Sequence, residues 1–212
     1  KPLKINIKFN LINITILEPA RIKAIPLSGT PGGDGSKLII DISAGAFFDL
    51  SGNALLASTN ITASEFPDIS PPTLLNPRLH LGTGILEIVA DETLDLSPST
   101  NVNLSRMYIS NSSADKYLSL ATSSHLPFVP IDGVSFNLSL SELQRVSLIA
   151  RSATPGGDGE ALVLDVEFGA VHDIGIKYNL QQFGVIIHEL PDRIPPIMLS
   201  VSINLTTGTL YV

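Results

Sequence analysis

The sequence contains no cysteine and no tryptophan, and only 16% of its 212 residues are charged. The absence of cysteine excludes disulfides, thiolate metal sites and cysteine nucleophiles. Positive charge is scarce as well, because 13 lysines and arginines stand against 20 acidic residues and no basic run occurs. A nucleic-acid surface needs clustered positive charge, so that class of partner is excluded. No apolar stretch approaches the roughly 18 residues that suggest a membrane span, so we expect no membrane insertion.

Turn-forming and apolar residues are plentiful instead. The chain has 16 glycines, 15 prolines and 44% hydrophobic residues, a composition typical of a β-rich protein with many turns and not of a disordered chain. Its mean hydropathy of +0.32 is high for a surface in contact with water. We therefore expect part of the surface to be covered.

An internal duplication is the strongest pattern in the chain. The hexapeptide beginning at Thr30 recurs at Thr154, and residues 1–88 align without a gap on residues 125–212, at an offset of 124. About 27 of the 88 pairs are identical, where chance would give roughly 6. The matched pairs include Glu18 with Glu142 and Arg21 with Arg145.

Proline pairs suggest the boundaries of the repeat. Pro-Pro resists both helix and central strand, and it stiffens a junction. Boundaries at these pairs predict an incomplete unit over residues 1–70, a complete unit over 71–195, and the first hairpin of a further unit over 196–212. We expect this arrangement, in which the chain starts and stops within a repeat unit, in a stretch of a longer array or in an assembling subunit.

Within a unit, the pattern is that of strands and turns. Residues 134–140 alternate between apolar and polar side chains, which predicts a strand with one buried face. Residues 162–166 and their copy 38–42 are almost wholly apolar, which predicts strands buried on both faces. We expect one short helix per unit, which in the second copy begins after Ser141. Together these signals predict an all-β fold of β-sandwich units, each with one helical turn.

Six asparagines occupy Asn-X-Ser/Thr sequons, where random placement would yield roughly two. They are Asn13, Asn60, Asn103, Asn111, Asn137 and Asn204. Asn13 and Asn137 are equivalent in the repeat and alternate with apolar residues, so glycans there would cover an apolar surface. This pattern predicts covalent N-glycans, a eukaryotic secretory route and an extracellular or cell-surface location; the alternative is that Ser-rich turns produce sequons by accident.

Six aspartates form repeat-equivalent pairs and are weak candidates for calcium. They are Asp34, Asp41 and Asp49 with their copies Asp158, Asp165 and Asp173. A calcium loop is usually denser in acids, so we expect these carboxylates to cap turns or to pair with Arg21 and Arg145. No dedicated metal site or cofactor is expected, and removal of calcium should leave the fold intact.

No catalytic motif emerges from the sequence. The motif Thr-Pro-Gly-Gly-Asp-Gly lacks the Gly-Lys-Ser/Thr of a phosphate loop, so it predicts a turn that uses positive φ. The four histidines are not repeated at the offset of 124 and are expected to be scattered surface residues. A duplicated unit without a duplicated reactive group argues against an enzyme.

Three short segments form a recognisable pattern. Residues 49–54 (Asp-Leu-Ser-Gly-Asn-Ala) and 67–72 (Pro-Asp-Ile-Ser-Pro-Pro) lie around the end of the first unit, and residues 92–96 follow in the second. These segments resemble those of a bacterial Ig-like repeat of the S-layer and adhesin kind. This resemblance implies tandem Ig-like β-sandwiches on a cell surface, an appendage or a matrix. The dense sequons look more like those of surface or mastigoneme-like proteins of algae and protists.

The incomplete units at the two ends predict self-association. The C-terminal tail, residues 195–212, repeats the hairpin of residues 79–89. We therefore expect the tail to dock onto the incomplete unit of the next copy, near residues 11–16 and 38–42. Repetition of this contact would form a head-to-tail filament. The expected contact residues are Pro195, Pro196, Ile197, Leu199, Val201, Ile203, Leu205, Leu210 and Val212. One long covalent array of neighbouring repeats is the first alternative. The second is an adhesin module that binds glycans or another surface, with or without calcium, although aromatic residues make up only 6% of the chain.

Overall fold

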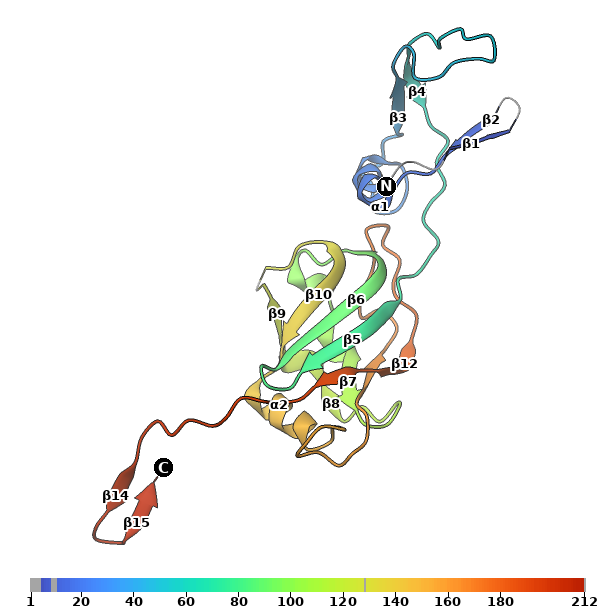
Figure 1. The fold of residues 1–212 in the computed structure, drawn as a ribbon. Coiled ribbons are helices and arrows are strands. Elements are labelled where there is room, and N and C mark those ends of the chain that lie inside the picture. Colours follow the sequence, from blue (N-terminus) through green and yellow to red (C-terminus); the bar gives the residue numbers. More distant parts are fainter. Residues whose placement is uncertain (1–4, 9–10, 128, 212) are drawn as a thin grey trace.

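The computed structural model describes residues 5–8, 11–127 and 129–211. The chain is mostly β-strand in several sheets, and the helices between the strands are short. In Figure 1, a central part lies between an N-terminal part that contains α1 (Glu18–Ala24) and a C-terminal hairpin. The all-β class predicted from the sequence is confirmed at this level. None of the described helices is long and apolar enough to span a bilayer.

Two sheets build the central part. The larger has the strand order β13-β5-β6-β10-β9 and the smaller has the order β12-β11-β7-β8. The larger sheet consists of β5 (Leu74–His80), β6 (Ile85–Leu94), β9 (Ser124–Leu126), β10 (Gly133–Ser139) and β13 (His188–Leu190). The smaller sheet consists of β7 (Met107–Ser110), β8 (Leu118–Ser119), β11 (Val163–Val166) and β12 (Gln182–Ile186). Neighbouring strands are antiparallel except for the parallel pair β13–β5.

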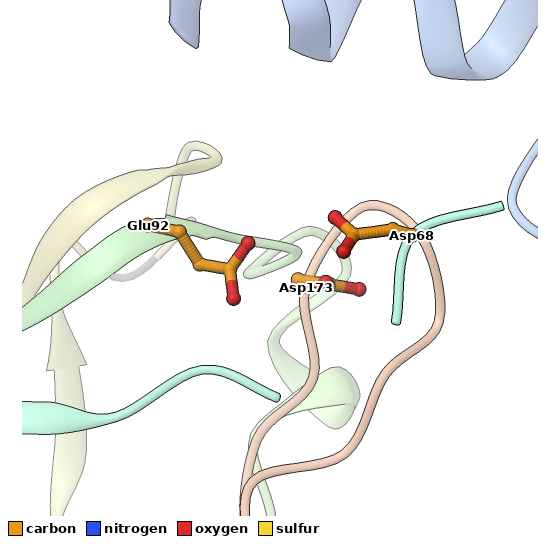
Figure 2. A group of neighbouring side chains, drawn as sticks. All are labelled: Asp68, Glu92 and Asp173. Atoms are coloured by element: carbon orange, nitrogen blue, oxygen red, sulfur yellow. The ribbon is translucent and has the colours of Figure 1, made fainter. Parts of the chain in front are cut away.

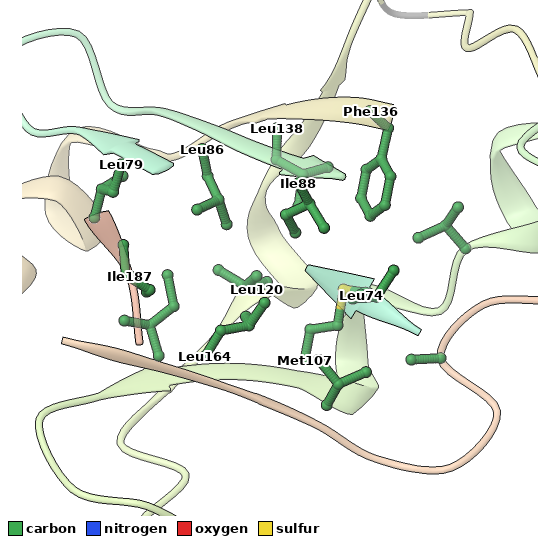
Figure 3. Close-up of a cluster of buried hydrophobic side chains, with 14 of the residues drawn as sticks. Leu74, Leu79, Leu86, Ile88, Met107, Leu120, Phe136, Leu138, Leu164 and Ile187 are labelled. Atoms are coloured by element: carbon green, nitrogen blue, oxygen red, sulfur yellow. The ribbon is translucent and has the colours of Figure 1, made fainter. Parts of the chain in front are cut away.

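One hydrophobic core joins the two sheets (Figure 3). Leu86 and Leu138 enter it from the larger sheet and Met107 from the smaller one, and each of these side chains is 0% exposed. All buried hydrophobic side chains of the described chain lie within residues 74–187. Since a fully buried aliphatic side chain contributes about 1.5–3 kcal/mol, this core is the main stabilising feature of the molecule.

Local sequence explains the elements of the central part. In β10, Phe136 and Leu138 are buried while Asn137 between them is half-buried, as the alternating pattern predicts, but Val134 at the start of the pattern is 46% exposed. Helix α2 (Glu142–Ile149) starts at the predicted position, and its capping box pairs Ser141 with Gln144 in both directions. Three short 3-10 helices complete this part, namely η2 (Ser99–Asn101), η3 (Leu104–Arg106) and η4 (Leu120–Thr122).

The N-terminal part and the C-terminal hairpin consist of small, separate elements. The N-terminal part contains β1 (Ile5–Lys8) paired with β2 (Leu11–Ile14), then α1 and η1 (Ile25–Leu27), then β3 (Ile39–Ile42) paired with β4 (Ser58–Thr62). At the other end, β14 (Ser202–Asn204) and β15 (Thr209–Tyr211) form the hairpin predicted around Gly208, which has a positive φ of 67°.

The duplication is visible in the structure. Strands β3 and β4 lie 124 residues before β11 and β12, with identical boundaries. The two copies of the Asp49 turn also match, because Asp49 N–H donates to the Asn53 carbonyl and Asp173 N–H donates to the Lys177 carbonyl, both at 3.0 Å. The left-handed residue of this turn is a glycine in the first copy, whereas Ile176 takes that place in the second with a φ of 60°. The turn is therefore retained where its sequence has changed.

The repeated hexapeptide is a turn, as predicted. Gly156 and Gly159 have φ values of 96° and 94°, which favour glycine. At Gly157 a Cβ atom would lie 2.0 Å from the Ser152 carbonyl oxygen, so only glycine fits between the helix end and this turn. The same contacts recur in the first copy around Gly33.

The two copies differ in burial, which corrects one prediction. The strand expected over residues 38–42 forms, but it is not buried on both faces, since Ile39 is 60% exposed and Ile40 is 48% exposed. Its counterpart Leu164 is 0% exposed, because it belongs to the hydrophobic core of the two sheets of the central part. Among the described strands, β3 pairs only with β4, and its residues are not part of this core. Of residues 11–70, only Ser28 is buried.

Candidate functional site

Three carboxylates from distant segments meet where the N-terminal part joins the central part. Asp68 lies in the connection after β4, Glu92 lies near the end of β6, and Asp173 lies in the turn after β11. One oxygen of each lies within 4.8 Å of the others. Figure 2 shows Asp68 and Glu92 extending toward one another, with Asp173 beside them. Among the described residues, this acidic cluster is the one group of three potential metal-ligand side chains that lie this close together.

Backbone hydrogen bonds fix the two aspartates. Asp173 Oδ1 accepts the N–H of Lys177 at 2.7 Å across its turn. Asp173 also forms an antiparallel bridge with Leu94, which ties this turn to the end of β6. Asp68 Oδ1 accepts the N–H of Ser70 at 2.9 Å. Both carboxylates therefore present their second oxygen, Oδ2, to other partners.

Arg21 of α1 is the cation that contacts the cluster. Its guanidinium donates to Glu92 Oε2 at 2.9 Å and pairs with Asp68. On its other side it binds both oxygens of Glu18, at 2.7 and 2.9 Å. Glu18 Oε1 also accepts the N–H of Thr93 at 3.1 Å, so α1 is attached to β6 through this arginine and this glutamate.

Burial and mutual repulsion perturb the cluster. Asp173 is 1% exposed, and its Oδ2 has no hydrogen-bond partner within the residues that the structure describes. Burial raises the pKa of Asp173. The pKa of Glu92 rises to about 7 because burial and the charges of Asp173 and Asp68 outweigh the pairing with Arg21. The single positive charge of Arg21 therefore does not balance the negative charges of the three carboxylates.

The contacts around Arg145, where the central part leads into the C-terminal hairpin, repeat half of this arrangement. Arg145 binds both oxygens of Glu142 at 2.7 Å and Asp192 Oδ2 at 2.8 Å, at the positions equivalent to Arg21, Glu18 and Asp68. Arg145 also donates to the Leu81 carbonyl at 2.8 Å. Positions equivalent to Glu92 and Asp173 would follow residue 212.

The six aspartates singled out from the sequence do not gather into one site. Five of them accept backbone N–H groups from residues near their own turn or strand, namely Asp34, Asp41, Asp49, Asp158 and Asp165. Only Asp173 joins a cluster, and neither arginine pairs with any of the six. Asp68 and Glu92 were not among the residues singled out from the sequence. The sequence signal that could have identified Asp68 was its equivalence with Asp192 in the repeat.

The sequon asparagines occupy different surroundings. Asn13, Asn60, Asn103 and Asn204 are exposed, whereas Asn111 and Asn137 are half-buried. The Nδ2 of Asn111, the atom that would carry a glycan, donates to Asp158 Oδ2 at 2.8 Å. Asn103 Oδ1 accepts from both the N–H and the hydroxyl of Ser105, at 3.2 and 2.6 Å.

One histidine departs from the expected surface positions. His125 is 8% exposed and lies beside Phe136, with ring centroids 6.2 Å apart. It is buried because β9 pairs with β10 at the edge of the larger sheet. Burial lowers the pKa of His125, and its Nδ1 has no partner within the described residues.

An aromatic hollow of about 420 Å³ lies beside the cluster-bearing turn. Phe168, His172 and Tyr178 line it together with Arg106 and the sequon residue Asn103. The ring centroid of Tyr178 is 6.0 Å from that of Phe168 and 5.4 Å from that of His172. The hollow therefore combines aromatic faces with polar side chains.

The expected contact residues of the tail are all solvent-exposed between Pro195 and Leu210, while Val212 lies outside the described residues.

Comparison with protein-family models, curated proteins and solved structures finds no match to this chain. Its function is therefore inferred from the repeat and from the contacts described above.

Proposed function

We propose that the chain is a structural, N-glycosylated extracellular protein of tandem Ig-like β-sandwich repeats, which assembles head to tail into a filament or fibrous coat. The observation that carries this proposal is the difference in burial between equivalent positions of the two copies. Phe136, Leu138 and Leu140 are 5%, 0% and 7% exposed. Their counterparts Ile12, Ile14 and Ile16 are 38%, 47% and 52% exposed.

The tail has the residues to extend the sheet that carries this exposed face. In the central part, β6 pairs with β10 in the same sheet, with Leu86 opposite Leu138 and Ile85 opposite Ser139. At the offset of 124, β15 is the copy of the start of β6, and β2 is the copy of part of β10. The same register would place Leu210 opposite Ile14 and Thr209 opposite Thr15. β1 is the one described partner strand of β2, so β2 keeps an unpaired edge.

The contact is head to tail because it joins two different surfaces. In Figure 1 the C-terminal hairpin and the N-terminal part lie at opposite ends of the central part. A contact of this kind does not close on itself, so its repetition generates a filament. The repeated Pro-Pro pair stiffens each junction.

N-glycans fit a protein with this surface. Four of the six sequon asparagines are exposed, and large apolar side chains such as Phe66 (89%) and Leu56 (82%) are exposed in the N-terminal part. Exposed apolar surface favours association, and bound sugar would keep it soluble. Glycan addition would require that the protein passes through the secretory route.

Paired cysteines test the proposed register, since the chain has no native cysteine. A Thr15→Cys variant mixed with a Thr209→Cys variant should form an intermolecular disulfide, because directly opposed antiparallel residues lie within disulfide reach. A Thr206→Cys variant, altered in the turn of the same hairpin, is the matched control and should cross-link far less. Equal or absent cross-linking in both mixtures would overturn the register.

The size of the native polypeptide distinguishes two forms of the assembly. A subunit near 22.5 kDa plus glycans supports exchange of the hairpin between separate molecules. A polypeptide several times larger would overturn exchange between molecules, and the completing hairpin would then belong to a neighbouring repeat of one covalent array.

The aromatic hollow supports a second candidate function, that of an adhesin module. Aromatic faces stack on sugar rings, and Arg106 and Asn103 provide polar partners beside them. A glycan array with a Tyr178→Ala variant tests this function, with Tyr117→Ala as a control on a different exposed tyrosine. Binding that Tyr178→Ala abolishes and Tyr117→Ala retains supports the adhesin, and an array without any bound glycan contradicts it.

A further inference from the structure

We propose that Asp68, Glu92 and Asp173 form a calcium site at the junction between the N-terminal and central parts. The three carboxylates come from separate segments, and one oxygen of each lies within 4.8 Å of the others. Calcium takes six to eight oxygen ligands in flexible geometry. Three carboxylates can provide part of such a set, and water or backbone oxygens complete it.

The independent sign of a ligand is the buried oxygen of Asp173. This residue is 1% exposed, and its Oδ2 has no hydrogen-bond partner in the described part of the chain. A buried charged oxygen without a partner is costly, and native structures pair such groups with hydrogen-bond donors or metals. A cation between Asp173 and the other two carboxylates satisfies this oxygen.

Arg21 does not fulfil this role. It contacts Glu92 and Asp68, but no hydrogen bond or ion pair joins it to Asp173. Its single charge is also shared with Glu18, which binds it through both oxygens. With Glu18 included, the four carboxylates and this arginine carry a net charge of about −3 when all are ionised, which a divalent cation reduces to about −1.

The location of the site determines what calcium would do. Asp68 lies on the connection between the two parts, whereas Glu92 and Asp173 belong to the central part. A shared cation would therefore hold the connection against the central part. The hydrophobic core within residues 74–187 does not include the site, so calcium removal should loosen the junction and leave the core folded.

Calorimetric titration of the full chain with calcium chloride tests the site. One bound calcium is expected, and Asp173→Asn should weaken its affinity at least tenfold. Asp192→Asn is the matched control, because Asp192 is the repeat copy of Asp68 and binds Arg145, but it does not belong to the acidic cluster of the described residues. Absence of binding, or equal affinity in wild type and Asp173→Asn, would overturn the proposal.

A second readout reports on the junction. Thermolysin cuts before large apolar residues such as Ile69, which is 79% exposed in the connection. Thermolysin itself requires calcium, so the three proteins are compared at one calcium concentration. There, the wild type and Asp192→Asn should be cut at this place more slowly than Asp173→Asn. Equal protection of all three proteins would contradict a site at this place. The result is independent of the hairpin register, since cysteine cross-linking does not require calcium.

Discussion

The burial difference between the two copies can be tested at one repeat position. Leu164 in β11 is 0% exposed, while Ile40 at the equivalent position in β3 is 48% exposed. Leu164→Ala and Ile40→Ala each remove three carbon atoms, so the two substitutions are chemically matched. Their difference in stability therefore measures the packing around each copy.

The structure sets the expected magnitudes. Truncating a fully buried leucine costs about 2.7–5 kcal/mol, because apolar transfer is lost and a cavity remains. For a unit of roughly 120 residues, this lowers the melting temperature by about 10–20 °C. The half-exposed Ile40 leaves no enclosed cavity, so its truncation should cost about 1 kcal/mol or less.

Thermal and urea unfolding followed by circular dichroism provide the assay, since the chain lacks tryptophan. Dilute samples should show the full loss for Leu164→Ala and almost none for Ile40→Ala. A loss below about 1 kcal/mol for Leu164→Ala would refute the described core. Equal large losses in dilute solution would refute the exposed state of the first copy.

Three further predictions follow from particular contacts. Because the pKa of Glu92 is raised to about 7, the folded protein binds a proton that the unfolded chain releases near pH 4.5. Stability should therefore fall as the pH rises from about 4.5 to 7, by at most about 3 kcal/mol. Glu92→Gln in a chelating buffer should reduce this slope in urea unfolding, and the part that remains comes from Asp173, whose pKa burial also raises. Peptide mapping after glycosidase treatment should find glycans on most of the six sequons, with Asn13 and Asn137 occupied together; unmodified asparagine at four or more sites would contradict this. Gly157→Ala should destabilise the central part by about 2 kcal/mol or more, because its Cβ would lie 2.0 Å from the Ser152 carbonyl oxygen. An unchanged urea midpoint would show that the backbone of this turn can move to accept the added Cβ.

Local patterns predicted the elements well. The Ser141 capping box, the positive-φ glycines and the alternation in β10 each depend on a few neighbouring residues, and each is present in the structure. The sequence also predicted the duplication, which recurs in identical boundaries of β3 with β11 and of β4 with β12.

Burial and the acidic cluster depend on contacts that local patterns do not contain. The apolar run at residues 38–42 looks like that at residues 162–166, but only the second belongs to the hydrophobic core of the two sheets, so the same pattern gives an exposed strand and a buried one. Asp68, Glu92 and Asp173 are distant in the chain, and the fold alone brings them together. His125 is likewise buried by strand pairing and not by its neighbours in sequence.

The strength of the proposed hairpin contact decides how the assembly can work. Six half-exposed side chains would become buried, namely Ile12, Ile14, Ile16, Ile40, Ile203 and Leu210. At about 1 kcal/mol each, they contribute roughly 6 kcal/mol. Association of free molecules costs about 4–15 kcal/mol, so this contact alone is weak between separate chains. When the units are joined on one polypeptide, the contact becomes intramolecular and the effective concentration is in the millimolar range. The same contact is then favoured without any new interaction. Disulfide yield between Thr15→Cys and Thr209→Cys molecules should therefore rise steeply with protein concentration, whereas two covalently joined repeats that carry the same pair should cross-link independently of it.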